Sequence, residues 1–327
     1  MSVRARMKST SDRRVLHSTV PVRMKGSEQS AHRGPLGHHQ PASRLLVATD
    51  LTERSDLALQ RALHMSEELK ACLHVLHVVE SGLPRRVALR RLNEARSVLQ
   101  EQIDLLVGSS PRGVSISVKI GDPHLEIIRE AIAHTSDAII VGPHRRSRAE
   151  DQGIVPTSVR MLRYSSRPIL FVRDMPAAPY RNAVVDVDLT ATSPFVVAAC
   201  RSLAPSAAVH LIHVYPGEEF AFPDAMPNAE SRATRLRRVH AFLDLLPGPL
   251  TEGGEVGICA SMTLAKGPVL DALATLSAQR LADLMVVGLR PDDARDLRLA
   301  LELNRRPSGS RPCDVLVVPG PAINALC

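Results

Sequence analysis

The sequence predicts an α/β protein made of two Rossmann-like domains, each with a parallel sheet covered by helices on both faces. The length of 327 residues suits two domains of ordinary size. Short apolar runs alternate along the chain with segments of helical periodicity, which is typical of repeated strand–helix units. The same order of units then occurs a second time, which indicates that one domain was duplicated.

The first units of the pattern run from residue 44 to residue 107. RLLVAT at 44–49 is a short apolar run and predicts a buried strand. Residues 53–70 place apolar side chains near helical spacing, and CLHVLHVV at 72–79 predicts the second strand. A long helix follows at 84–107, where apolar residues recur at steps of three to five.

The next units complete a five-stranded domain. VSISVKI at 114–120 alternates and predicts the third strand. The helix predicted at 121–134 has Pro123 in its first turn, where the missing N–H costs little. DAIIVG at 137–142 predicts the fourth strand, and RPILFV at 167–172, after a helix near 155–166, predicts the fifth.

Five blocks of the second half repeat blocks of the first in the same order. Both copies share the core Asp-Leu-Thr-x-x-Ser, which begins at Asp50 and at Asp188. The matching pairs are 182–193 with 43–55, 209–215 with 73–79, 265–273 with 119–128, 282–288 with 136–142, and 313–319 with 167–173. Such ordered self-similarity predicts a tandem of two equivalent domains.

These patterns set the expected domain boundaries. The first domain spans 44–173, a linker rich in Pro and Ala spans 174–180, and the second domain spans 181–319. Residues 1–43 mix Ser, His, Gly, Pro and Arg without apolar periodicity, which predicts a disordered basic tail. Residues 320–327 form a short C-terminal tail.

Composition and charge exclude several classes of protein. The net charge of +7 lies mostly in the tail, which carries +6 and leaves the two domains nearly neutral. Together with 2% aromatic residues, this argues against nucleic acid as a partner. No apolar run is long enough to span a membrane. The 5 cysteines form no CxxC pair, which favours buried free thiols and a cytoplasmic location.

The blocks resemble the universal stress protein family. The resemblance covers 44–173 and 181–319, and rests on the strand-end acid of VATD, the strand ending LHVVE, the Gly-x-Pro before a helix and the IIVG/VVG strand. It implies the adenine nucleotide hydrolase-like fold, in which each five-stranded parallel sheet has the order 3-2-1-4-5. The strand order reverses between the first and fourth strands, so a ligand is expected beyond their carboxyl ends.

The resemblance implies an adenine nucleotide such as ATP as the ligand of the first domain. Many family members bind ATP with a loop of Gly, two residues, Gly, nine residues, Gly, then Ser or Thr. Counted from Gly142, Arg145 takes the second Gly position, while Val155 and Pro156 take the last two positions. The residues expected to bind the nucleotide are Asp50, Leu51, Thr52, Val78, Gly142, His144, Arg145, Thr157 and Ser158.

The second domain is expected to hold no nucleotide. Counted from Gly288, Pro291 takes the second Gly position, Leu301 the third and Glu302 the Ser position. A carboxylate at the phosphate position repels a phosphate group. The first domain is compromised as well, because Pro156 lacks an N–H that a phosphate would need.

Alternatives remain open for the charged residues of the first loop. Arg145, Arg146 and Arg148 form either a phosphate clamp or a solvated loop, or one of them fills the vacated phosphate site and pairs with Asp50. Asp50 is in turn either a ligand contact or part of a helix cap, a role for which Thr52 or Ser55 could compete.

Other chemistry finds little support in the sequence. There is no GxxxxGK[ST] and no GxSxG motif. His74 and His77 lie three apart on a strand and face opposite sides, so they cannot share a metal ion, and His210 and His213 repeat the pattern in the second copy. We therefore expect no metal site and no enzymatic activity.

The sequence thus favours a stress-response or regulatory protein of universal stress type that binds an adenine nucleotide in its first domain without catalysis. The alternative is a protein-interaction scaffold that binds no ligand, and a nucleotide hydrolase is supported by fold analogy alone. The two domains are expected to pack against each other through their fifth-strand edges, and a homodimer or unknown protein partners are also allowed.

Overall fold

The computed structural model describes residues 16–20, 41–107, 113–142, 156–173, 179–215, 232–246, 259–290, 293–305 and 313–320. Strands and helices alternate along these residues, as the apolar periodicity predicts. None of the described helices is long and apolar enough to cross a membrane.

The first half of the chain folds into five parallel strands with four helices. Its strands are β2 (Arg44–Thr49), β3 (Cys72–Glu80), β4 (Val114–Gly121), β5 (Ala138–Val141) and β6 (Ile169–Phe171). Its helices are α1 (Glu53–Leu69), α2 (Arg85–Val107), α3 (Pro123–Ala133) and α4 (Thr157–Tyr164). The strands lie side by side in the order β4-β3-β2-β5-β6.

The second half repeats this arrangement. Its strands are β7 (Asn182–Asp186), β8 (Ala208–Tyr215), β9 (Cys259–Lys266), β10 (Leu284–Leu289) and β11 (Asp314–Pro319). Its helices are α5 (Ser193–Leu203), α6 (Arg232–Leu245), α7 (Val269–Gln279) and α8 (Ala294–Arg305). The strand order is β9-β8-β7-β10-β11. Numbered within each half, both orders read 3-2-1-4-5, as the resemblance implied.

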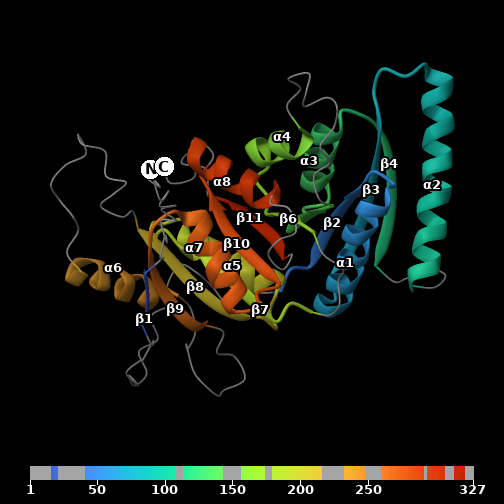
Figure 1. The fold of residues 1–327 in the computed structure, drawn as a ribbon. Coiled ribbons are helices and arrows are strands. Elements are labelled where there is room, and N and C mark those ends of the chain that lie inside the picture. The colour runs from blue at the N-terminus through green and yellow to red at the C-terminus, as the bar shows by residue number, and fades with distance from the viewer. Residues whose placement is uncertain are drawn as a thin grey trace, which may run out of the picture.

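The two halves join into one continuous sheet of eleven strands, seen edge to edge in Figure 1. The fifth strands, β6 and β11, pair antiparallel, with Leu170 opposite Leu316. This pairing removes two exposed strand edges, each of which would otherwise present unpaired backbone groups to solvent.

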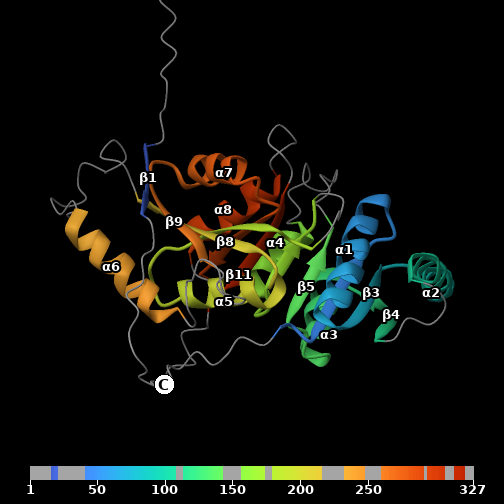
Figure 2. The ribbon, with the colours of Figure 1, turned by 90° about the horizontal axis from the view of Figure 1, so that it is seen from below.

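Helices cover both faces of this sheet. Residues that alternate along each strand enter different cores: Leu45 and Val47 join one, and Leu46 joins the other. The first core takes its helical residues from α1, α2, α5 and α6, and the second from α3, α4, α7 and α8. In Figure 2, α7 lies on one side of the sheet and α5 and α6 lie on the other.

A buried polar network joins the two halves near the β6–β11 seam. Asp314 at the start of β11 accepts hydrogen bonds from Arg61 Nε of α1 at 3.1 Å, from the Tyr180 hydroxyl at 2.6 Å and from the Arg173 backbone N–H at 2.8 Å. The Arg61 guanidinium also lies 4.4 Å from the centre of the Tyr180 ring. Three of these side chains, those of Arg61, Asp314 and Tyr180, are buried.

Part of the predicted tail is ordered, which corrects the expectation that residues 1–43 form no structure. Residues 16–20 form strand β1 (Leu16–Val20), which pairs antiparallel with β9 at the outer edge of the sheet. The edge of β9 offers a row of unpaired backbone groups, and a short segment with Thr and Val can satisfy them without apolar periodicity of its own.

The thiols also differ from expectation, because Cys72 is exposed while Cys200 and Cys313 are buried.

Candidate functional site

The carboxyl ends of the first and fourth strands meet in each half of the sheet. β2 pairs parallel with β5, and β7 pairs parallel with β10. Asp50 follows β2 and Gly142 follows β5, while Asp188 follows β7 and Gly288 lies in β10. Each pair therefore sits at the point where the strand order reverses, which is where ligands bind in open α/β sheets.

The turn after β2 has a fixed geometry that recurs after β7. Leu51 and Leu189 both have positive φ angles, 61° and 60°, which a leucine adopts only under constraint. Asp50 Oδ1 accepts hydrogen bonds from the Thr52 N–H at 3.1 Å and the Thr52 hydroxyl at 2.6 Å. Asp188 Oδ1 accepts the same two bonds from Thr190, at 2.9 Å and 2.6 Å.

These bonds settle which residue caps α1. Thr52 is the N-cap, and Ser55 Oγ accepts the Thr52 N–H at 3.1 Å. Asp50 therefore holds the turn before the helix and is not its cap. Burial works to raise the pKa of Asp50, but hydrogen bonds from Thr52 and Ser55 outweigh it and hold the pKa below its ordinary value.

Gly142 is required by close packing against the first turn of α1. A Cβ at this position would lie 3.1 Å from Arg54 O and 3.2 Å from Ser55 Cα, both backbone atoms. At Gly288 the same Cβ would meet only a methyl group of Val196, at 3.1 Å. The glycine at 142 thus brings β5 close to the Asp50 turn.

The other residues that were predicted to bind a nucleotide in the first domain follow Asp50 and Gly142 along the chain or lie on neighbouring elements. Val78 lies on β3, partly buried beside the second core, and Thr157 and Ser158 form the first turn of α4. Pro156 is the N-cap of α4. His144 and Arg145 lie outside the described residues, as do Arg146, Arg148 and Val155, so their roles stay predictions.

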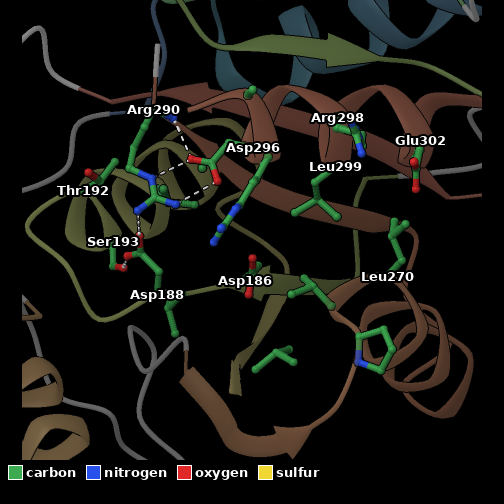
Figure 3. Close-up of a pocket in the computed structure, with 18 residues that line it drawn as sticks. Asp186, Asp188, Thr192, Ser193, Leu270, Arg290, Asp296, Arg298, Leu299 and Glu302 are labelled. Carbon is green, nitrogen blue, oxygen red and sulfur yellow. Dashed lines mark hydrogen bonds and ion pairs between the residues drawn. The ribbon is translucent and has the colours of Figure 1, made fainter. Parts of the chain in front are cut away.

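The second domain has a cleft of about 640 Å³ at the matching position, drawn in Figure 3. Asp186 and Asp188 lie at the end of β7, Arg290 follows β10, and α8 supplies the opposite wall. The labelled wall residues include Asp296, Arg298, Leu299 and Glu302. A cleft of this size suits a small molecule.

Arg290 lines this cleft and pairs with three of its neighbouring carboxylates. Its Nε and Nη2 donate to the two oxygens of Asp296 at 2.7 Å and 2.9 Å, a bidentate pair. Nη2 lies 3.0 Å from Asp293, and Nη1 lies 3.7 Å from Asp188. Figure 3 shows the guanidinium between Asp188 and Asp296. An arginine of the chain itself thus lies beside Asp188 in this cleft.

Asp186 is the most perturbed acid of the cleft. Burial raises its pKa to about 7, and the negative charges of Asp188 and Asp296 add to the effect, against the opposing charge of Arg290. Near neutral pH its carboxyl group is therefore close to half protonated and can donate as well as accept a hydrogen bond.

Helix α8 differs from the helix that the loop count implied. Leu301 and Glu302 would mark a helix N-terminus in a nucleotide-binding loop, but α8 begins at Ala294, so both lie well inside it. Asp293 instead accepts the backbone N–H of Arg295 at 2.8 Å, at the start of the helix. The helix end that would attract a phosphate is occupied by a carboxylate of the chain itself.

Sequence reasoning missed Asp186, Arg290 and Asp296. The two acids of VVDVD are two residues apart at the end of a strand, and so share one face. That spacing was a detectable signal for Asp186. Nothing in the sequence pattern alone pairs Arg290 with Asp296, because the five residues between them must first bring the two side chains together.

Comparison of the sequence with known proteins identifies one family. A model of the universal stress protein family matches residues 42–173. Universal stress protein E of Salmonella typhi is 25% identical over 196 residues, and that of Escherichia coli K12 is 24% identical over 196 residues. Each match covers 53% of this chain and spans 61% of the relative's length.

Solved structures share the fold over most of the chain. A universal stress protein from Archaeoglobus fulgidus has a TM-score of 0.61 at 16% identity and covers 86% of this chain and 98% of its own. A putative universal stress protein from Pseudomonas aeruginosa UCBPP-PA14 has a TM-score of 0.56 at 20% identity, and covers 86% of this chain and 95% of its own. Residues 42–173 of this chain are thus similar to the universal stress protein family, and the solved structures share its fold.

Proposed function

We propose that this chain is a non-catalytic regulatory protein of universal stress type, with an adenine-nucleotide site in the first domain only. The second domain would be a diverged second copy that serves as the packed partner of the first. The proposal rests on one observation: the crevice of the second domain satisfies its own charges through Arg290.

Three further features support this division of roles. The family match falls on residues 42–173, within the first half of the chain. Both turns hold Asp50 and Asp188 through the same threonine bonds, so the difference between the domains lies beyond the turn. Asp188 faces Arg290, whose position two residues after Gly288 corresponds to His144 in the first domain.

An arginine that is already paired with Asp296 and Asp293 competes with any ligand for the space and the charges of this crevice. A nucleotide phosphate would have to displace these carboxylates or lie beside them, and both outcomes cost electrostatic free energy. In the first domain, Asp50 stands ready to accept hydrogen bonds from an adenine or ribose group. We infer that nucleotide enters the first crevice and is excluded from the second.

Titration of the full-length, nucleotide-free protein with a fluorescent ATP analogue tests the proposal. Wild type should bind one nucleotide per chain. Asp50→Ala should weaken binding by about 10- to 100-fold, the range for a hydrogen bond to a charged group of about 1.5–3 kcal/mol. Asp188→Ala is the matched control, because it removes the same turn bonds and should leave nucleotide affinity unchanged.

The results separate the candidate functions. If Asp50→Ala and Asp188→Ala weaken nucleotide binding equally, the loss comes from disrupting either strand-end turn, and a site confined to the first domain is contradicted. Absence of nucleotide in native mass spectra and in the titration would favour the ligand-free scaffold. ATP turnover that disappears with Asp50→Ala would replace the regulatory proposal with a hydrolase.

A further inference from the structure

Three potential metal ligands converge in the first domain, away from its nucleotide crevice. His74 lies near the start of β3, while Glu130 and His134 lie at the end of α3. Crossover helices run opposite to the strands, so the end of α3 lies near the strand starts. This cluster therefore sits at the amino-terminal edge of the sheet, opposite the Asp50 turn.

The donor atoms of the cluster are close together. Glu130 Oε2 lies 3.2 Å from His74 Nε2 and 3.5 Å from His134 Nε2. Each of the three residues offers one ligand atom, and these atoms all lie within 4.8 Å of one another. The two imidazole rings stack with their centres 3.7 Å apart.

The two separations between Glu130 and the histidines are close to those around a tetrahedral ion, and one of the stacked rings has to turn so that both Nε2 atoms face it. Two ligand atoms bound to zinc at roughly 2.0–2.1 Å, at the tetrahedral angle, lie about 3.4 Å apart. We propose that His74, Glu130 and His134 bind a divalent transition-metal ion of the zinc type. Two imidazoles and one carboxylate leave the fourth position to water, which can enter through an adjoining hollow of about 280 Å³ lined by His74 and His134.

Neighbouring side chains orient two of the ligands. His74 Nδ1 lies 2.8 Å from the Ser115 hydroxyl on β4, the residue opposite it in the sheet. This contact leaves Nε2 directed at Glu130. Lys119 Nζ lies 3.0 Å from Glu130 Oε1, so the lysine holds one carboxylate oxygen and leaves Oε2 to the ion. Such outer partners fix ligand orientation in metal sites.

Burial and neighbouring charges act on two of these three side chains. Burial lowers the pKa of His74, and the charges of His134 and Lys119 add to this against the effect of Glu130. Burial would raise the pKa of Glu130, but the hydrogen bonds and charges of Lys119 and His74 together outweigh it, and the pKa is lowered. Among the residues that the structure describes, Arg44 and Lys119 are cations that lie near the cluster.

The second domain contains a natural control. His210 repeats His74, and its Nδ1 lies 3.0 Å from the Ser261 hydroxyl. The helix-end bond from His134 N–H to Glu130 O recurs from Arg280 N–H to Leu276 O. Leucine and arginine therefore stand where the first domain has glutamate and histidine, and the second domain cannot form the cluster. The strand histidine belongs to the shared fold, whereas the two helix ligands belong to the first domain alone.

Zinc titration of the full chain in competition with a chromophoric chelator tests the site, with Co²⁺ absorption reporting tetrahedral geometry. Wild type should bind one ion per chain. His134→Gln and Glu130→Gln should each weaken zinc binding more than tenfold, at least the loss seen when an outer partner is removed. His134 is exposed, so His134→Gln should keep the native circular dichroism spectrum.

The matched pair His74→Asn and His210→Asn removes the same strand histidine from each domain. The first should abolish the zinc site and the second should leave it intact. Zinc binding that persists unchanged in the cluster variants would assign the ion to other histidines and overturn the proposal. A wild-type chain that takes up no zinc would overturn it equally.

Discussion

The buried network at the domain seam offers a sharp test of what holds the two halves together. In Asp314→Asn the side chain keeps its size but loses its charge, and the Arg61 guanidinium remains buried beside it. The side chains of Arg61 and Asp314 are 6% and 0% exposed, so water cannot replace the lost partner. We expect a large loss of stability and a change in how the halves unfold.

The magnitude follows from burial. Removing one partner of a buried ion pair typically costs about 3–5 kcal/mol, because the remaining charge loses its counter-ion in the interior. Tyr180 and the Arg173 N–H also donate to Asp314, and each loses a charge-assisted hydrogen bond. By contrast, Arg61→Met together with Asp314→Leu removes both charges, so the double variant should lose less stability than the two single variants summed.

Urea unfolding followed by far-ultraviolet circular dichroism measures this, since the chain has 0 tryptophans for fluorescence. Wild type should unfold in one transition, and Asp314→Asn should separate the halves into two. Asp283→Asn is the control, because Asp283 accepts backbone N–H groups of Arg181 and Asn182 but lies outside the buried pair. A loss below about 1 kcal/mol for Asp314→Asn, or strictly additive single variants, would refute the reasoning.

Three further predictions concern the crevices. Asp186 has a folded pKa of about 7, above the value of 3.8 for a free carboxyl, so its protonated form stabilises the fold at low pH and stability falls as pH rises toward 7. Asp186→Asn should therefore gain about 1–4 kcal/mol over wild type at pH 8 and little at pH 4, and a gain independent of pH would contradict the raised pKa. Gly142→Ala should lower the free energy of unfolding in urea by about 1–3 kcal/mol, because the new methyl group meets helix backbone. Gly288→Ala should lower it less, because its neighbour is a movable side chain. Equal losses would count against the close approach of β5 to α1. Arg290→Ala should lower the free energy of unfolding by no more than about 1 kcal/mol, because the guanidinium is half exposed. A loss above about 2 kcal/mol in thermal melts would show that its ion pairs contribute strongly to the stability of the fold.

The sequence was sufficient to predict the layered fold because its signals are local. Strands buried on both faces read as short apolar runs, and the helices between them carry the 3.6-residue period. The predicted helix at 84–107 and the observed helix Arg85–Val107 differ by one residue. The sequence did not predict β1, because this strand is stabilised by pairing with the edge of β9, which is more than 230 residues away in the chain.

The sites were harder to predict because they depend on tertiary neighbours. His74 was judged only against His77, its neighbour in sequence, and the two do face apart. Its partners Glu130 and His134 come from a helix that crosses back over the sheet, and their spacing of four residues was the available signal. Asp50 and Gly142 were placed correctly at adjacent strand ends because the doubly wound topology dictates it, whereas the Arg290 pairing depends on where α8 begins.

The antiparallel pairing of β6 with β11 has a geometric consequence. Because each half-sheet is parallel within itself, reversing one half relative to the other points their strands in opposite directions, as if related by a twofold axis through the seam. The two crevices must then open on opposite rims of the molecule, and no single small molecule can bridge them. Any signal that ligand occupancy sends from one half to the other has to pass through contacts between the halves, such as the β6–β11 pairing and the bond from Ala42 N–H to Ser202 O.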